Sequence, residues 1–263
     1  MKRARVAFGG AVHDATEVDG RIRLADGRVV DDADVVWLSP FVPRTIFALA
    51  LNYADHAAEL ASKSPKEPGV FLKAQAEPIV FLKGANSVIG HRGWTRRPAD
   101  ANFMHYECEL SVVIGRGGRR IPRERAYEHV AGYTVGNDYA IRNFLEGYYR
   151  PNLRVKSRDT CTVLGPWLVD AADVPDPMNL RLTTHVNGRC TQDGNTRDMI
   201  TDVPGLIEWL SEIMTLGPGD VIMTGTPVGS VDVQPGDEVV TEIEGIGRLV
   251  NTIIGDESFA PVD

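Results

Sequence analysis

The chain has 263 residues and a formal net charge of −8, with 43% hydrophobic and 24% charged residues, which is ordinary for a globular protein that buries a core. The acidic balance argues against nucleic acid as a partner, because nucleic-acid binders need a basic face to neutralise phosphates. No segment approaches the roughly 20 apolar residues of a membrane span, and the charged N-terminus lacks the apolar segment of a signal peptide. The three cysteines are scattered and fit a reducing compartment, so we expect a cytoplasmic protein that binds no membrane.

Residues 1–43 are expected to form a small N-terminal β unit. Their β-branched residues are interrupted by Asp19-Gly20 and Asp26-Gly27, dipeptides that suit tight hairpin turns. Two prolines near residue 40 mark the end of the unit. We therefore predict a second, larger domain over residues 44–263.

Beyond residue 44 the pattern is mostly that of strands. Residues 45–51 predict a strand that leads into a helix over 55–62, where Asn52 and Asp55 are suitable capping residues. Apolar residues at helical spacing predict a further helix over 203–214. More strands are predicted over 70–72, 79–82, 107–114, 131–135, 221–224, 238–244 and 248–254, and short helical segments over 126–130 and 139–147. The sum is a β-rich mixed α+β fold with short covering helices.

Two glutamates alternate within the strand predicted over 107–114. Successive side chains of a strand point to opposite faces, so Glu107 and Glu109 share one face while Cys108 and Leu110 point to the other. Two carboxylates at this spacing can bind one cation, and oxygen ligands favour Mg²⁺, Mn²⁺ or Ca²⁺ over zinc. The same alternation also fits a strand with one solvated face, so spacing alone leaves both interpretations open.

A third carboxylate, Asp138, lies where a predicted strand is expected to run into a helical turn. Ligands often gather at strand ends, which makes Asp138 a candidate third metal ligand. Aspartate is also a favoured residue at the start of a helix. The spacing does not decide between these two roles.

Positive charge is concentrated after Asp138. Five cations lie between residues 142 and 158 of this acidic chain, namely Arg142, Arg150, Arg154, Lys156 and Arg158. Arginine suits bidentate recognition of carboxylates, and a lysine beside a metal can hold or protonate a developing oxyanion. A solvated basic loop is the alternative interpretation.

Two further segments contain candidate site residues. His56 and Glu59 stand three residues apart on the predicted helix, where a carboxylate-oriented imidazole is a usable general base; a surface contact is the alternative. The turn over 224–229 lacks the Gly-Lys-Ser/Thr ending of a phosphate-binding loop. Its backbone amides and the Thr226 hydroxyl are suited to binding a substrate carboxylate.

Together and in this order, these segments resemble the fumarylacetoacetate hydrolase family. The glutamate pair with Asp138 and Lys156 is the most specific part of the resemblance, which covers about residues 45–255. Residues 137–158 are most similar to the branch of bifunctional isomerase/decarboxylases of homoprotocatechuate (4-hydroxyphenylacetate) degradation, and there to the second half of a duplicated enzyme. The matching stretches are 51–59, 81–84, 106–109, 132–138, 156–159, 214–220 and 225–227.

The resemblance implies a β-sandwich or roll with Mg²⁺ or Mn²⁺ at its open end, within residues 44–263. A match to one half of a duplicated enzyme implies a homodimer, a higher homo-oligomer or pairing with a sister subunit. Cys108 departs from the small residue expected between the glutamates, but its side chain is predicted to face away. The implied roles are metal ligation by Glu107, Glu109 and Asp138, a lysine beside the metal at Lys156, a base formed by His56 and Glu59, and substrate carboxylates held by Arg142, Arg150 and Arg154.

The implied chemistry is decarboxylation and keto–enol or diene isomerisation of a 2-oxo dicarboxylate or tricarboxylate. A 2-oxo acid chelates Mg²⁺ through its carboxylate and keto oxygens, and both reactions then pass through the same enolate. Hydrolysis of a carbon–carbon bond in an acylpyruvate or fumarylpyruvate, and decarboxylation of oxaloacetate, use the same enolate and stay open. A non-catalytic protein that only binds a dicarboxylate is a further alternative.

Overall fold

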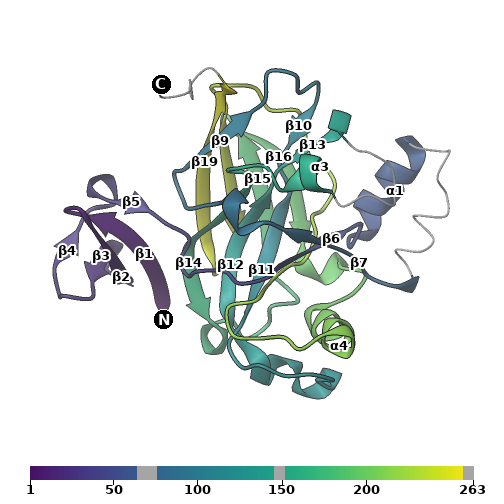
Figure 1. Cartoon of the computed structure of the whole chain (residues 1–263), viewed down its shortest axis with the longest axis horizontal. Coiled ribbons are helices and arrows are strands. Elements are labelled where there is room, and N and C mark those ends of the chain that lie inside the picture. The colour runs from purple at the N-terminus through teal and green to yellow at the C-terminus, as the bar shows by residue number, and fades with distance from the viewer. Residues whose placement is uncertain (64–75, 145–151, 257–263) are drawn as a thin grey trace.

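The computed structural model describes residues 1–63, 76–144 and 152–256. Strands dominate these ranges, and the helices are few and short (Figure 1). Within them, no helix is long and apolar enough to span a membrane.

One large sheet runs through the molecule. Its strands follow the order β4-β3-β2-β1-β14-β12-β11-β17-β6-β7, with β5 paired to β1 and β8 paired to β14. The strands are β1 (Lys2–Phe8), β2 (Ala11–Val18), β3 (Arg21–Leu24), β4 (Val29–Val30), β5 (Val36–Trp37), β6 (Ile46–Ala50), β7 (Ile79–Lys83), β8 (Val88–Ile89), β11 (Cys108–Ile114), β12 (Val130–Asp138), β14 (Thr162–Asp170) and β17 (Val221–Met223).

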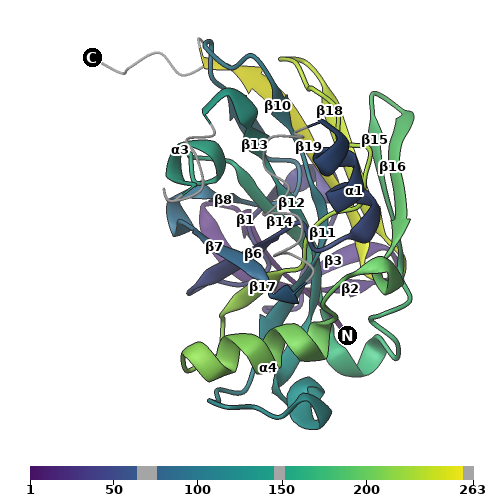
Figure 2. The same cartoon turned by 90° about the vertical axis from the view of Figure 1, so that its right-hand side faces the viewer.

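A second sheet faces the middle of the first and completes a sandwich. Strand β12 contacts β18 and β19 across the interface, and β14 contacts β19 (Figures 1 and 2). The core between the sheets includes Leu110 and Val135 from the first and Leu249 and Ile253 from the second. This confirms the β-rich sandwich expected from the sequence. The second sheet has the order β16-β15-β18-β19-β9, formed by β9 (Trp94–Arg97), β15 (Arg181–Val186), β16 (Arg189–Asn195), β18 (Glu238–Ile243) and β19 (Gly247–Gly255), and a separate pair joins β10 (Met104–His105) to β13 (Ala140–Ile141).

Short helices cover the sandwich. Helix α4 (Val203–Ile213) begins where the Asp202 side chain accepts a hydrogen bond from the Gly205 amide, and Pro204 occupies its first turn. Its apolar side chains, such as Leu206 and Leu210, are buried against the core. The described residues also form helices α1 (Ala54–Lys63) and α3 (Leu153–Lys156) and the 3₁₀ segments η1 (Asp32–Asp34), η2 (Ala85–Ser87), η3 (Arg123–His129), η4 (Arg142–Phe144), η5 (Ala171–Asp173) and η6 (Thr196–Asp198).

Two predictions of local structure are wrong. The helical turn expected over 139–147 begins instead with strand β13, because Ala140 and Ile141 pair with β10, and only η4 turns helically before the described residues end at 144. Asn52 does not cap helix α1, because its Oδ1 accepts a hydrogen bond from the Thr201 amide at 2.9 Å. The strand predicted over 70–72 lies outside the described residues.

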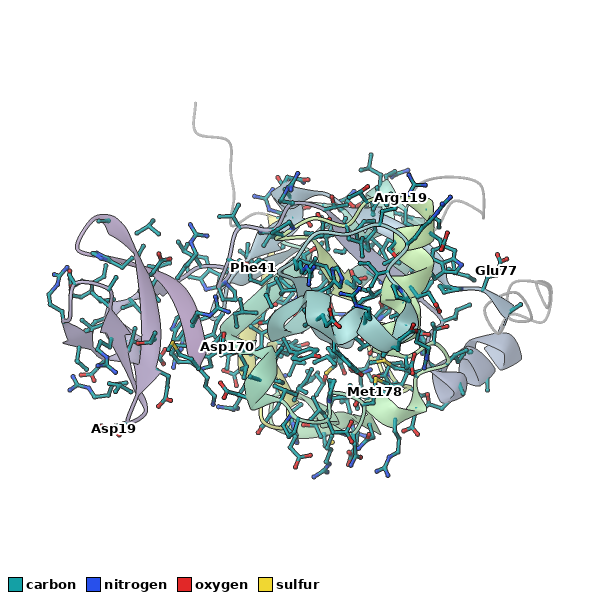
Figure 3. The ribbon with its side chains drawn as sticks, turned by 90° about the horizontal axis from the view of Figure 1, so that it is seen from below. Asp19, Phe41, Glu77, Arg119, Asp170 and Met178 are labelled. Carbon is teal, nitrogen blue, oxygen red and sulfur yellow. The ribbon has the colours of Figure 1, made fainter. Side chains whose placement is uncertain are left out.

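The N-terminal strands β1–β5 project from one side of the sandwich, with Asp19 at the turn between β2 and β3 (Figures 1 and 3). They enclose a small core of their own that includes Val6, Ile22 and Trp37. They also continue the large sheet, because Lys2 and Arg3 of β1 pair with β14. The division into two domains at residue 43 therefore stays a prediction.

Candidate metal centre

Three carboxylates meet at the end of the β11–β12 pair. Glu107 immediately precedes β11, Glu109 lies within it, and Asp138 is the last residue of β12. The antiparallel register places Cys108 opposite Asn137, and the Asp138 amide donates to the Glu107 carbonyl at 2.9 Å. The three side chains are buried, and one carboxylate oxygen from each lies within 4.8 Å of the others.

The alternation expected for β11 is present in the structure. Cys108 is fully buried in the core between the sheets, on the opposite face to the glutamates. The glutamate face is not a solvated one, because Glu107 is 7% exposed and Glu109 is 0% exposed. Buried carboxylates this close together repel one another unless cations lie between them.

Glu109 carries the clearest sign that a cation belongs here. Its Oε2 accepts a hydrogen bond from the Gly225 amide at 2.9 Å, whereas its buried Oε1 has no hydrogen-bond partner among the described residues. Burial raises the pKa of Glu109 well above its usual range, and the charges of Asp138 and Glu107 raise it further. A hard divalent cation bound by all three carboxylates would satisfy Oε1 and offset the repulsion, so the donor set fits Mg²⁺ or Mn²⁺.

Lys156, the last residue of α3, bridges two of the carboxylates. Its ammonium donates to Glu107 Oε2 and, at 2.9 Å, to Asp138 Oδ2. Burial alone would lower the pKa of Lys156, but the carboxylates of Asp138 and Glu107 outweigh it and the pKa is raised. The structure therefore brings Lys156 to the carboxylates as a charged hydrogen-bond donor.

A second lysine, Lys83 at the end of β7, was not singled out from the sequence. Its side chain is 0% exposed and its ammonium donates to Asp138 Oδ1. It also donates to the backbone carbonyls of Lys156 and, at 3.3 Å, of Cys161. A single lysine at the end of an apolar strand has no spacing that indicates such a role; only its place in a family-like stretch could have drawn attention to it.

Arg142 lies beside the carboxylates and is oriented by a histidine that the sequence left without a role. Its Nε donates to His105 Nε2 at 2.7 Å, and its Nη2 lies 3.4 Å from Glu107 Oε1. His105 Nδ1 lies 3.1 Å from the Tyr106 carbonyl oxygen, which assigns the proton to Nδ1 and leaves Nε2 as the acceptor. Burial, and then the charge of Arg142, lower the pKa of His105 to about 3, so the ring is neutral.

The charge around Glu107 is dominated by these neighbours. Burial opposes its ionisation, but the charge of Lys156 outweighs burial. Arg142 and the nearby His56 act in the same direction as Lys156, so the pKa of Glu107 lies below its usual range. His56, on α1, is therefore close to the centre. The interpretation of His56 as a surface contact is wrong, because it is 6% exposed. The side chain of Glu59 lies outside what the structure describes, and the dyad stays a prediction.

The remaining predicted residues are less central. Thr226 is buried, and its hydroxyl accepts a hydrogen bond from Gln192 Nε2 at 3.0 Å. The guanidiniums of Arg154 and Arg158 lie over the Phe144 ring, 4.6 and 4.7 Å from its centre. Arg150 lies outside the described residues. Arg142 is thus a predicted arginine that the structure places at the carboxylates.

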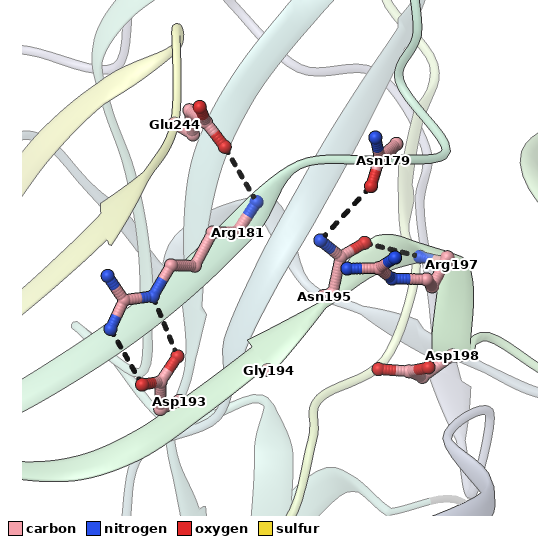
Figure 4. A pocket seen from close by; sticks show the side chains of 8 residues that line it. All are labelled: Asn179, Arg181, Asp193, Gly194, Asn195, Arg197, Asp198 and Glu244. Atoms are coloured by element: carbon pink, nitrogen blue, oxygen red, sulfur yellow. Dashed lines mark hydrogen bonds and ion pairs between the residues drawn. The ribbon is translucent and has the colours of Figure 1, made fainter.

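A polar surface hollow of about 490 Å³ lies elsewhere on the molecule (Figure 4). Arg181 and Asp193 form an ion pair in its lining, with Nη2 at 2.7 Å from Oδ2. It contains none of the three carboxylates and is not a candidate for the same chemistry. Its lining residues are Asn179, Arg181, Asp193, Gly194, Asn195, Arg197, Asp198 and Glu244.

A strand-rich sandwich with a buried carboxylate centre is the architecture of a metal-binding protein, and comparison with known proteins shows its family. Residues 45–254 match the family model described as fumarylacetoacetate (FAA) hydrolase, C-terminal. The chain therefore belongs to the fumarylacetoacetate hydrolase family, as its sequence motifs suggest.

Three known proteins are similar over much of the chain. The 4-hydroxyphenylacetate degradation bifunctional isomerase/decarboxylase of Salmonella dublin is 57% identical over 214 residues, which are 81% of this chain and 48% of that protein. The crystal structure of 5-carboxymethyl-2-hydroxymuconate delta-isomerase from Mycobacterium smegmatis has a TM-score of 0.82 and 37% identity, covering 97% of this chain and 99% of that one. Fumarylpyruvate hydrolase from Pseudomonas aeruginosa, in complex with Mn²⁺ and pyruvate, has a TM-score of 0.73 and 31% identity, covering 83% and 91%. The chain spans about half the length of the bifunctional relatives that it matches.

Proposed function

We propose that the chain is a divalent-metal-dependent enzyme that decarboxylates and isomerises a 2-oxo polycarboxylate in 4-hydroxyphenylacetate (homoprotocatechuate) catabolism. Glu107, Glu109 and Asp138 would hold the metal, Mg²⁺ or Mn²⁺. The single observation that carries the proposal is this buried triad with its unpartnered Glu109 oxygen. The names of the Salmonella dublin and Mycobacterium smegmatis relatives supply the substrate class.

When bound, the cation supplies Lewis acidity to the carboxylate and keto oxygens of a 2-oxo acid. Decarboxylation would break the carbon–carbon bond to the leaving carboxylate. The electron pair of that bond would move through the conjugated chain to the keto oxygen as CO₂ departs. A proton returned to carbon completes the reaction. Isomerisation removes a proton from one carbon and returns it to another through the same delocalised enolate, so one site serves both reactions.

The chain's own side chains supply the other parts of this chemistry. Lys156 is a charged donor at the edge of the carboxylate cluster, suited to stabilising the developing oxyanion. His56 is buried near Glu107 and is suited to moving the proton, with Glu59 as its predicted partner. Arg142 is about one-third exposed and suited to a distal carboxylate of the substrate. Thr226, Arg150 and Arg154 remain predicted substrate contacts without this support.

Hydrolysis of a carbon–carbon bond is the second candidate. The buried position of His56 favours it, because water activation needs a base beside the metal. The similarity to fumarylpyruvate hydrolase points the same way. Oxaloacetate decarboxylation would use the same groups. We also propose that two such chains, or one chain and a sister subunit, form the working oligomer, which acts in the cytoplasm.

The test is to incubate the purified protein with 5-oxopent-3-ene-1,2,5-tricarboxylate and to measure CO₂ release. The proposal predicts release that stops with EDTA, returns with Mg²⁺ or Mn²⁺, and is lost in Asp138→Ala with the fold retained. Cleavage of fumarylpyruvate without CO₂ release from the tricarboxylate would establish the hydrolase instead. Full activity with the metal removed would refute the metal centre.

A further inference from the structure

Two lysines bind the two oxygens of the same carboxylate. Lys83 donates to Asp138 Oδ1 and Lys156 donates to Asp138 Oδ2. Their exposure differs: the Lys83 side chain is 0% exposed, whereas that of Lys156 is 6% exposed. Both ammoniums are close enough to the triad to be taken for the catalytic lysine, and their hydrogen bonds set them apart.

The hydrogen bonds of Lys83 explain the difference. A lysine ammonium has three hydrogens to donate, and Lys83 has three acceptors, which are Asp138 Oδ1 and the carbonyl oxygens of Lys156 and Cys161. No hydrogen is left for a substrate. Lys156 has two acceptors among the described residues, Glu107 Oε2 and Asp138 Oδ2, which leaves one hydrogen for an incoming oxyanion.

The acceptors of Lys83 also come from three separate segments. Asp138 ends β12, Lys156 ends α3, and Cys161 immediately precedes β14. Lys83 itself ends β7, the edge strand of the large sheet. One buried ammonium thus ties a carboxylate of the triad to the backbone of the segment that carries the other lysine.

We infer that Lys83 is a positioning residue of the metal centre: it fixes Asp138 through Oδ1 and leaves Oδ2 to Lys156 and the cation. The inference rests on the proposed function, since it assigns a role around the proposed metal. Groups that orient a ligand in this way are usually worth about 10- to 100-fold in metal affinity.

The inferred role and a simple charge effect predict opposite changes in metal affinity when Lys83 is neutralised. If Lys83 contributed only its positive charge, neutralising it would strengthen the binding of a divalent cation, because like charges repel. If Lys83 positions Asp138, neutralising it weakens metal binding. The direction of the change therefore separates the two roles.

The experiment compares Lys83→Met, which removes all three donors, with Lys83→Gln, which retains a shorter neutral donor. The control is Ser87→Ala, since Ser87 is also fully buried and hydrogen-bonded beyond the end of β7 but bonds to Gly84 and Thr162 rather than to the triad. Mn²⁺ affinity is measured by titration calorimetry and by the electron paramagnetic resonance signal of free Mn²⁺. Activity is then measured against Mn²⁺ concentration for each variant and for Lys156→Met.

We expect Mn²⁺ affinity to fall roughly 10- to 100-fold in Lys83→Met and less in Lys83→Gln, and to be unchanged in Ser87→Ala. Saturating Mn²⁺ should restore most of kcat in the Lys83 variants but not in Lys156→Met. Unchanged or tighter Mn²⁺ binding in both Lys83 variants would overturn the inference, as would a loss of kcat that saturating Mn²⁺ does not recover.

A measurement on the wild type covers the case in which the buried substitutions prevent folding. Nitrogen-15 spectra of the lysine ammoniums, assigned by comparison with Lys156→Met, should show a slowly exchanging Lys83 signal that pyruvate does not shift when Mg²⁺ is present. A Lys83 signal that responds to pyruvate would overturn the inference. If the wild type binds no Mn²⁺, the proposed function fails as well; if only the Lys83 result is contrary, the proposed function stands.

Discussion

Replacing Glu109 by glutamine should make the metal-free protein more stable and the metal-loaded protein less so. Glutamine keeps an oxygen for the Gly225 amide but cannot ionise beside Glu107 and Asp138. Because the pKa of Glu109 is raised from its ordinary value of 4.5, the folded protein holds a proton that the unfolded chain releases. Between pH 4.5 and pH 7 this costs at most about 3 kcal/mol of stability, at 1.36 kcal/mol for each pH unit. The sign follows: metal-free wild type loses stability as pH rises above 4.5, and Glu109→Gln does not share this loss.

Bound metal should reverse the order of stability, so that wild type is more stable than Glu109→Gln. A ligand at 100 times its dissociation constant stabilises the protein that binds it by about 2.7 kcal/mol, and Glu109→Gln lacks one of the three ligands needed for this. Urea unfolding of both proteins at pH 7, in EDTA and in excess Mn²⁺, gives the four free energies of unfolding. A Glu109→Gln protein that is less stable than wild type in EDTA would refute the repulsion argument, and equal stabilisation of both proteins by Mn²⁺ would refute ligation by Glu109.

Two further predictions concern histidines. His105→Leu removes the acceptor that orients Arg142, so it should raise KM for the multiply charged substrate about 10-fold, with a smaller effect on kcat. His105→Gln should retain part of the affinity. Steady-state kinetics in which both variants lost kcat alone would contradict this prediction. His91 accepts a hydrogen bond from the Val250 amide at 3.0 Å, and burial lowers its pKa to about 4. In the unfolded chain His91 takes up a proton below its ordinary pKa of 6.5, whereas in the folded protein it does not. The free energy of unfolding should therefore fall by up to about 3 kcal/mol between pH 6.5 and pH 4. Urea unfolding across this range checks it, and an equal loss in His91→Gln would assign the effect to other groups.

The fold class could be predicted because apolar alternation marks the central strands. Strand β11 is the clearest example, since Leu110 and Val112 face the core and the glutamates face away. Strand β14 was not predicted because Gly165 and Pro166 interrupt its pattern. Strands β15 and β16 were missed because they lie at one side of the second sheet and carry polar residues such as Thr184 and Gln192.

The candidate site could be predicted only in part. Strand alternation places Glu107 and Glu109 on one face, but the approach of Asp138 depends on the pairing of β11 with β12, which spacing does not reveal. Lys83 is harder still, because it reaches Asp138 across 55 positions of sequence from the edge of the sheet. The burial of His56 likewise depends on where α1 packs and not on its local sequence.

Diffraction from crystals soaked in Mn²⁺, recorded at the manganese absorption edge, tests the central claim most directly. The account predicts an anomalous peak in contact with one oxygen each of Glu107, Glu109 and Asp138, in a soaked wild-type crystal, and its loss in Glu109→Gln. A wild-type crystal with full Mn²⁺ occupancy elsewhere and no peak between these three carboxylates would contradict it.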